Sequence, residues 1–499
     1  MKKYPVYLVL LPLFFTLYHY NQLFGFLSWS HTALLFLLVL SAAAVSFSLF
    51  YLFTRSRFKA AVAAFFLLLF LLYFGPWHDF IKSITGQPAI TRYSVIISVT
   101  LILLAGITWY FFKKKEALLT FSGYLNILFL ILCVVELGRI GINISRVNKD
   151  HNLIYPGKPI CNNYTATHLP DSAKPDIYLL IFDEYSNNRV LKENWNFDNS
   201  DMDSFMLQQG FYIPVNSTAN YNFTPFSISS LLNMNYIDEK TGTRADIAIN
   251  WLKGIKSMTD NETICILEKE QYSIRFIAPF ENNIDDIGIN DEFEAFPENY
   301  IYDLTFPGRF ETDIAWQFKT RNSLLTPEKE DSLIEERYRK KKDDVIRTIN
   351  AIKQTTDSSS HRKPKFVYGH FMITHKPHMY DSAGNKLPGN DSSRYNLYNT
   401  YIQQVQYANK VIKELTAYIK QTNKKNTIII IESDHGYREF PADKSALYYP
   451  NICFIYFPGS DYSSLYPTMS LVNEFRIVFN RFFNQRLPLL KDSTVYVRF

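Results

Sequence analysis

The sequence contains few cysteines, only short basic stretches, and no repeated or low-complexity tract. It has 4 cysteines among 499 residues, and its formal net charge is only +5. The small net charge and the lack of a long Lys/Arg-rich tract leave the chain without the electrostatic footprint of a nucleic-acid-binding protein. We therefore expect no nucleic-acid partner.

The cysteines divide into two pairs by their surroundings. Cys133 lies in an apolar run and Cys453 in an apolar segment typical of a buried strand, which favours packed side chains over reactive thiols. Cys161 and Cys265 can pair if this part of the chain faces an oxidising compartment. A disulfide usually needs a Cα separation of about 5.5–6 Å, which the sequence cannot establish, so the pairing stays open here.

Apolar residues are concentrated in the first third of the chain. Five segments there are close to the ~20 apolar residues needed to cross a hydrocarbon core, and five such runs in series are not expected in a soluble protein. We predict a five-helix transmembrane domain at 1–140, a connector at 141–174 and a soluble domain at 175–499. The five segments are residues 4–23, 31–53, 60–80, 93–112 and 118–137.

The loops between these segments differ in charge, and Lys and Arg near helix ends are retained in the cytoplasm. With the N-terminus inside, only Lys82 and Arg92 of the inter-helix loops lie outside. Five crossings then place the soluble domain outside the membrane. The basic residues on the inner side are Lys2, Lys3, Arg55, Arg57, Lys59, Lys113, Lys114 and Lys115, and Arg139, Arg146 and Lys149 after the last helix reduce this bias without reversing it.

The soluble part alternates between strand-like and helix-like segments, which predicts an α/β sandwich around a largely parallel sheet. In such sheets, functional groups gather beyond the carboxyl ends of the strands. The predicted strands are residues 177–182, 272–278, 365–371, 427–432 and 452–457, and the predicted helices are residues 202–209, 225–232, 328–353 and 398–420.

Two of the predicted strands end in possible metal ligands. The first runs into Asp183 and Glu184, and carboxylates are hard ligands for divalent cations. The strand at 427–432 runs into Asp434 and His435, which offer an oxygen and a nitrogen ligand side by side, and Gly436 lets the backbone turn after them.

A threonine and a group of histidines complete the set. Thr224 stands where a helix N-cap belongs and Pro225 fits the first helical position, so that the hydroxyl faces the positive end of a helix. His370, His375 and His378 supply three of the 10 histidines at one strand exit, where an imidazole can bind a metal or protonate a leaving oxygen. We rank His375 first, His370 second and His378 third.

Together these features resemble the alkaline phosphatase superfamily, in particular sulfatase-like membrane transferases such as lipoteichoic acid synthases and lipid A phosphoethanolamine transferases. The resemblance implies a bacterial inner-membrane protein with a periplasmic or extracellular catalytic domain. It implies that Asp183, Thr224, Asp434 and His435 hold the metal, with Glu184 as a weaker candidate. Thr224 is then the nucleophile, His375 and His370 assist catalysis, and His378 and Arg438 contact the substrate.

The sequence departs from these relatives at two points. True sulfatases carry Cys or Ser in a C/S-x-P-x-R motif for conversion to formylglycine, and the segment after Thr224 has neither that Cys nor the Arg. Sulfate-ester hydrolysis is therefore disfavoured. The transferases usually have an acidic or small residue after Asp-His-Gly, whereas Tyr437, Arg438 and Glu439 follow here.

The leading hypothesis is a phosphoryl-group transferase of the phosphoethanolamine or phosphoglycerol type. It would use a membrane lipid as donor and a glycan or lipid as acceptor. A phosphoester hydrolase and a catalytically inactive envelope binding or assembly protein are the alternatives. The mixed oxygen and nitrogen ligands suit Zn²⁺ or Mn²⁺ better than Ca²⁺ or Mg²⁺. The oligomeric state, donor and acceptor are not predictable from the residues.

The loop charges yield a prediction about topology. An alkaline phosphatase fused to the C-terminus is expected to be active, and a fluorescent protein that folds only in the cytoplasm is expected to be dark there. The two fusions are compared in whole cells at equal expression. The opposite pattern would show that the soluble domain lies inside the cell.

Overall fold

The computed structural model describes residues 4–147, 160–167, 169–237, 244–278, 297–315, 327–357, 363–388, 397–423 and 426–497. The chain divides into two compact units. The first comprises Met1–His151 and Ala295–Leu324, and the second comprises Asn152–Glu294 and Leu325–Phe499. Residues 148–159 and 168 of the predicted connector at 141–174 lie outside the described part of the chain.

The first unit contains the expected apolar helices. Four of them are long and apolar enough to cross a membrane. Only 17% of the apolar window of α2 and 6% of that of α4 is buried, and apolar surface of this extent needs hydrocarbon or a partner to cover it. The helices are α1 (Tyr7–Gln22), α2 (Trp29–Thr54), α3 (Arg57–Thr85), α4 (Tyr93–Lys113) and α5 (Lys115–Val147).

The helix α1 is shorter than the sequence predicts. It has 16 residues, which at the usual rise makes about 24 Å, less than the roughly 30 Å of a hydrocarbon core. Asn21 near its end donates from Nδ2 to Glu136 Oε2 of α5 over 2.6 Å, and the Tyr7 amide donates to Asn126 Oδ1 over 2.8 Å. The five helices are present, but α1 does not meet the length criterion, and its crossing of the membrane stays a prediction.

Two short helices from the later part of the sequence belong to the first unit. Arg309 forms an ion pair with Asp79 of α3 at 2.5 Å. The Gly75 amide donates to the Leu304 carbonyl over 2.9 Å, and a Cβ at Gly75 would approach that oxygen to 2.6 Å. A segment that the sequence places in the soluble domain therefore packs on α3. The helices are α11 (Pro297–Asp303) and α12 (Phe306–Asp313).

The second unit is built on a five-stranded sheet in the order β2-β3-β1-β4-β5. The first four strands are parallel, and β5 runs antiparallel to β4. Every residue of β1, β3 and β4 is buried, as their mainly apolar sequences predict. The strands are β1 (Asp176–Phe182), β2 (Ser273–Ile277), β3 (Lys365–Phe371), β4 (Thr427–Glu432) and β5 (Cys453–Tyr456).

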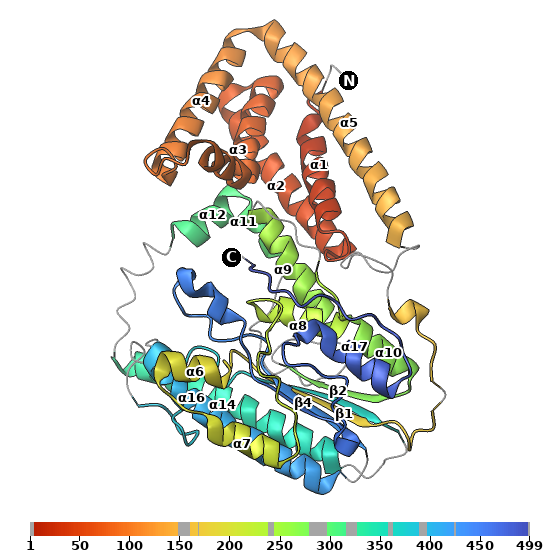
Figure 1. Cartoon of the computed structure of the whole chain (residues 1–499). Helices are drawn as coiled ribbons and strands as arrows, with labels where there is room; N and C mark the ends of the chain where they lie inside the picture. Colours follow the sequence, from red (N-terminus) through yellow and green to blue (C-terminus); the bar gives the residue numbers. More distant parts are fainter. Residues whose placement is uncertain are drawn as a thin grey trace. The chain divides into compact units, whose positions relative to one another are not determined.

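Helices cover both faces of this sheet (Figure 1) and form a separate apolar core with each. The predicted α/β sandwich with a largely parallel sheet is confirmed. One layer consists of α6 (Asn188–Trp195), α7 (Ser200–Gln208), α14 (Pro327–Asp357) and α16 (Leu397–Thr422). The other consists of α8 (Thr224–Asn233), α9 (Arg244–Thr259), α10 (Glu262–Lys269) and α17 (Leu471–Phe482). Short 3₁₀ helices lie at η1 (Cys161–Asn163), η2 (Ala442–Tyr448) and η3 (Pro458–Ser460).

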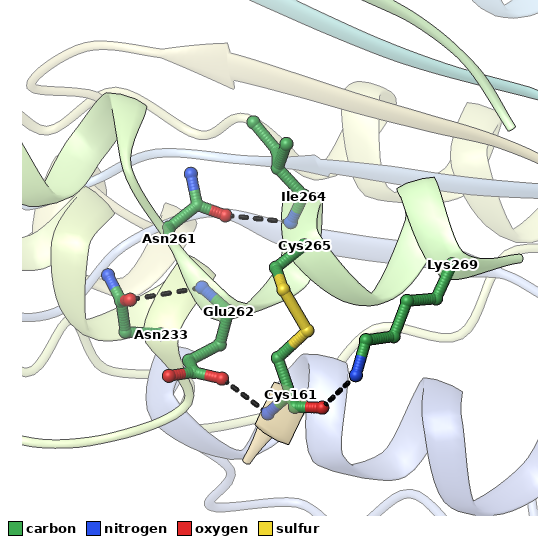
Figure 2. The surroundings of a disulfide bond; sticks show 7 residues. All are labelled: Cys161, Asn233, Asn261, Glu262, Ile264, Cys265 and Lys269. Carbon is green, nitrogen blue, oxygen red and sulfur yellow. Dashed lines mark hydrogen bonds between the residues drawn. A yellow bond between two sulfur atoms is a disulfide. The ribbon is translucent and has the colours of Figure 1, made fainter. Parts of the chain in front are cut away.

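A disulfide joins Cys161 to Cys265, with a Cα separation of 6.1 Å (Figure 2). It fastens η1 to α10 at the edge of the second core. Glu262 Oε2 accepts from the Cys161 amide over 2.6 Å, and Lys269 Nζ donates to the Cys161 carbonyl over 2.5 Å. The pairing that the sequence left open is therefore formed.

Loss of this disulfide is expected to destabilise the second unit. The cysteines are 104 residues apart, and releasing a loop of that length typically lowers the free energy of unfolding by about 2–4 kcal/mol. Cys265→Ala is expected to unfold at lower denaturant concentration than wild type under oxidising conditions. Cys133→Ala, which removes a free thiol, is the control. Identical unfolding of wild type and Cys265→Ala would contradict the expectation.

Candidate active site

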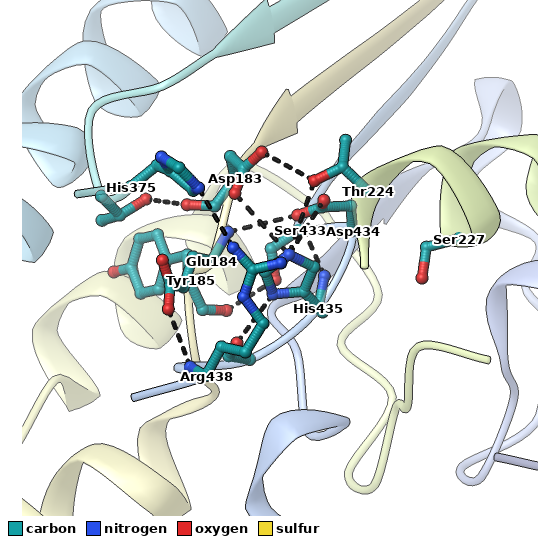
Figure 3. Close-up of polar contacts among 12 residues, drawn as sticks. Asp183, Glu184, Tyr185, Thr224, Ser227, His375, Ser433, Asp434, His435 and Arg438 are labelled. Atoms are coloured by element: carbon teal, nitrogen blue, oxygen red, sulfur yellow. Dashed lines mark hydrogen bonds and ion pairs between the residues drawn. The ribbon is translucent and has the colours of Figure 1, made fainter. Parts of the chain in front are cut away.

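The site lies where β1, β3 and β4 end together (Figure 3). In the register of the sheet, Ile181 of β1 pairs with His370 of β3 and with Glu432 of β4. Parallel strands that end at the same level bring the residues following them to one edge. Asp183 and the pair Asp434–His435 meet there.

Asp183 is the centre of the contacts. Its carboxylate is fully buried, and Oδ2 accepts a hydrogen bond from Thr224 Oγ1 over 3.1 Å and lies 3.2 Å from His370 Nε2. His435 Nε2 lies 3.8 Å from Asp183 Oδ1. Burial alone would raise the pKa of Asp183, but the surrounding histidines, His375 among them, hold it below its ordinary value.

The histidine of the second motif is oriented by its own backbone. His435 Nδ1 lies 2.8 Å from the Gly436 carbonyl, which can only accept, so Nδ1 carries the proton. The lone pair of Nε2 then faces the site, 3.4 Å from Asp434 Oδ2 and 3.5 Å from Thr224 Oγ1. An imidazole held in this way is arranged as a metal ligand.

Thr224 reaches the site from the beginning of α8, but not as the predicted N-cap. The first helical hydrogen bond runs from Ser227 N to Phe223 O over 3.0 Å, so Phe223 is the N-cap and Thr224 is the first helical residue. The Thr224 hydroxyl is thereby free of the helix and donates to Asp183. Ser227 points away from the site in Figure 3 and donates to the Tyr221 carbonyl over 2.8 Å.

The residues present fit a divalent cation. Asp183 Oδ1 and Asp434 Oδ2 are buried and have no hydrogen-bond partner, and buried carboxylate oxygens without partners are costly unless a cation or proton satisfies them. Ligand atoms of Asp183, His370 and Asp434 lie within 4.8 Å of one another. These oxygen and nitrogen donors, with His435 and Thr224, are a ligand set suited to Zn²⁺ or Mn²⁺.

Glu184 is held beside this set in a strained conformation. Its φ of 61° lies in the left-handed region, which non-glycine residues adopt rarely. Its amide donates to Asp434 Oδ1 over 3.2 Å, and its Oε1 accepts from the Arg438 amide over 2.8 Å. Burial raises the pKa of Glu184 to about 7, although Arg438 opposes the shift. Ligand atoms of Asp183, Glu184 and His375 also lie within 4.8 Å of one another.

His375 and Arg438 form a pair at the rim of the site. His375 Nδ1 lies 2.8 Å from the Lys376 carbonyl, and its Nε2 lies 3.2 Å from the guanidinium of Arg438. Burial lowers the pKa of His375 to about 3, although Asp183 acts in the opposite direction. The ring is therefore neutral, with Nδ1 donating and Nε2 accepting. The Arg438 guanidinium also lies 4.4 Å from the ring centre of Phe223.

The structure does not bring His378 to the cluster. Its ring is buried, its Nδ1 lies 2.7 Å from Thr400 Oγ1, and it packs against Tyr401. Its predicted contact with substrate has no support in these interactions. The other predicted residues, Asp183, Glu184, Thr224, His370, His375, Asp434, His435 and Arg438, are gathered at one site.

Three supporting residues were not predicted from the sequence. Tyr368 OH lies 2.8 Å from His370 Nδ1, Thr374 Oγ1 donates to the Asp183 carbonyl, and the Phe223 ring packs under Arg438. Only Tyr368 had a usable signal, since residues two apart on a strand share a face. The other two contacts depend on how loops fold over the strand ends.

Comparison with known proteins identifies the family. A family model described as Sulfatase matches residues 185–459, more than half of the chain. The chain belongs to the sulfatase family. It is accordingly an enzyme of the transferase or hydrolase kind. The matched segment contains Thr224, His370, His375, Asp434 and Arg438, while Asp183 lies just before it.

No curated protein matches the sulfatase-family chain, but many solved structures resemble it. The C-terminal periplasmic domain of EcEptC from Escherichia coli matches with a TM-score of 0.37 and 12% identity, over 64% of this chain and 85% of that one. Phosphoethanolamine transferase EptA from Neisseria meningitidis matches with a TM-score of 0.32 and 11% identity, over 91% and 89%. An alkaline phosphatase superfamily protein from Vibrio parahaemolyticus matches with a TM-score of 0.37 and 15% identity, over 64% of this chain and 68% of that one.

The ligand set of this sulfatase-family site yields a prediction. Asp434→Asn and His435→Ala are each expected to lower metal affinity by more than the roughly 10–100-fold typical of an outer-shell partner, because each removes a direct ligand. Affinity is measured by chelator competition on folded, full-length protein. His378→Asn, which changes a histidine outside the cluster, is expected to bind metal as wild type does. Unchanged affinity in Asp434→Asn and His435→Ala would remove both residues from the site.

Proposed function

We propose that the chain is a membrane-anchored phosphoryl-group transferase that moves a lipid headgroup phosphoester to a glycan or lipid of the cell envelope. The supporting observation is Thr224: its hydroxyl leaves the helix end and points at a buried carboxylate among the metal-type ligands. A hydroxyl placed in this way is suited to covalent catalysis.

The proposed reaction has two halves. In the first, Thr224 Oγ1 forms a bond to phosphorus while the bond from phosphorus to the lipid oxygen breaks, and the departing lipid hydroxyl takes up the proton that Thr224 loses. In the second, an acceptor hydroxyl replaces Thr224 on phosphorus, and a proton returns to Thr224. A phospho-threonine links the halves.

The protein residues have distinct parts in this scheme. The Thr224 proton is directed at Asp183 Oδ2, 3.1 Å away. Asp183, Thr224, Asp434 and His435, with His370 beside them, would hold a divalent cation, which would lower the pKa of the threonine hydroxyl and polarise a phosphoryl oxygen. Arg438 offers a fixed positive charge to the phosphoryl group. Because His375 Nε2 accepts from Arg438, its tautomer favours orienting that guanidinium over donating a proton.

The proposed location follows from the membrane helices and the disulfide. Phospholipid headgroups lie at the membrane surface, where an enzyme anchored by apolar helices meets them. The Cys161–Cys265 bond is typical of proteins exposed to an oxidising compartment such as the periplasm. Both features support an inner-membrane protein with its catalytic domain outside the cytoplasm.

The nucleophile is tested with Thr224→Ala and Thr224→Ser. Thr224→Ala is expected to lower turnover of a phospholipid donor by about 10³-fold or more, because no attacking atom remains on the protein. Thr224→Ser keeps the hydroxyl and is expected to retain measurable turnover. Ser227→Ala changes a hydroxyl that points away from the site, so it is the matched control.

Rates are measured on full-length protein in detergent with metal present, and mass spectrometry looks for a phosphoryl adduct on Thr224. An adduct that water alone resolves, at the same rate with and without acceptor, would identify a hydrolase. Full turnover in folded Thr224→Ala would refute the covalent mechanism. Absence of turnover in the wild type and in all three variants would favour a non-catalytic envelope protein.

A further inference from the structure

A second group of ligand-type residues lies between the sheet and α17, apart from the site around Thr224. It consists of Glu432, Cys453 and Glu474, whose ligand atoms lie within 4.8 Å of one another. Glu432 ends β4, Cys453 begins β5 and pairs with it in the antiparallel register, and Glu474 stands in the first turn of α17. Three separate elements thus direct two carboxylates and a thiol to one point.

This group is enclosed and has no countercharge. Glu432 is 0% exposed, and Cys453 and Glu474 are each 2% exposed. Both carboxylate oxygens of Glu432 and Oε2 of Glu474 are buried without a hydrogen-bond partner. In the described part of the chain, neither carboxylate forms an ion pair with Lys, Arg or His.

Burying two carboxylates in apolar surroundings costs free energy unless a cation or a proton compensates their charge. Cys453 belongs to an apolar core, and its thiol donates to Glu474 Oε1 over 3.5 Å. The carboxyl groups of Glu432 and Glu474 also lie close enough to share a hydrogen bond when one of them is protonated. Two buried carboxylates without a cation must give up charge or be held apart. Burial raises the pKa of Glu474, so a compensating ion or proton is needed here at neutral pH.

We propose that Glu432, Cys453 and Glu474 bind a structural Zn²⁺ distinct from the metal at Thr224. A thiolate with two carboxylates matches the sulfur and oxygen ligands that Zn²⁺ accepts, whereas Ca²⁺ and Mg²⁺ select oxygen alone. Ser217 lies beside them: its hydroxyl is close to the Cys453 thiol and donates to Asn451 Oδ1 over 2.8 Å. Its oxygen, or water, is a candidate for a fourth ligand.

The ion would fasten β4, β5 and α17 to one another. Glu432 precedes Asp434 by two residues, so the same fastening holds the strand end that presents Asp434 and His435. Because the three ligands are enclosed, the metal enters as the chain folds, and binding displaces protons from the thiol and from any protonated carboxyl.

Cobalt reports on this site selectively, because a thiolate bound to Co²⁺ gives a near-ultraviolet charge-transfer band and no cysteine lies among the ligands proposed at Thr224. Full-length protein is produced in cells grown with Co²⁺ in place of Zn²⁺. Wild type is expected to show the band. Cys453→Ser is expected to lose it together with the metal held by the cluster, and Glu474→Gln is expected to weaken or lose it.

Two controls separate this proposal from the proposed function. Cys133→Ser removes the other free cysteine and is expected to keep the band. His435→Ala is expected to keep the band even though it loses the metal at Thr224. A folded wild-type protein without the band, when metal is present at the Thr224 site, would overturn the proposal and indicate that Glu432 and Glu474 share a proton. The wild-type spectrum therefore tests the proposed Zn²⁺ site even if Cys453→Ser fails to fold.

Discussion

The arrangement of the second unit depends on one buried carboxylate, that of Asp183. A charge removed from water needs partners, and here they come from β3, from the start of α8 and from the residues after β4. Each is far from Asp183 in sequence. Parallel pairing of β1 with both β3 and β4 makes the meeting possible, because it sets the strand ends level. The sheet therefore positions the site, because its register determines which residues meet at the strand ends.

Those parts of the fold that depend on unbroken apolar runs were predictable. The strands β3 and β4 occur at the predicted residues, and β1 begins one residue earlier, because a strand buried on both faces leaves a continuous hydrophobic signal. Asp183, Asp434 and His435 were identifiable because they follow such strands directly. Thr224 was identifiable because Pro225 follows it, although the helix N-cap is Phe223. That shift by one residue frees the hydroxyl for Asp183 instead of using it on the helix backbone.

Features that depend on tertiary contacts were not predictable. His375 and His378 lie on the same strand exit, and their spacing does not reveal that one ring faces Arg438 while the other is enclosed with Thr400. The short helices α11 and α12 give no sequence signal of an association with α3. That association consists of Phe306 packed against Phe70 and Phe74 of α3, the Arg309–Asp79 ion pair and one backbone hydrogen bond. In the sequence, Glu432 is recognisable only as the end of an apolar strand. Its proximity to Glu474 of α17 becomes evident only in the folded structure.

Burial also decides which side chains at the site carry charge. The imidazole of His375 is neutral, so it cannot attract an anion, and the raised pKa of Glu184 weakens its repulsion of one. The guanidinium of Arg438 stacks on the Phe223 ring and donates to His375 Nε2. Tyr437 follows Gly436 directly, and Arg438 follows Tyr437. A phosphoryl group bound beside Thr224 would lie near the guanidinium of Arg438, a donor suited to phosphate oxygens.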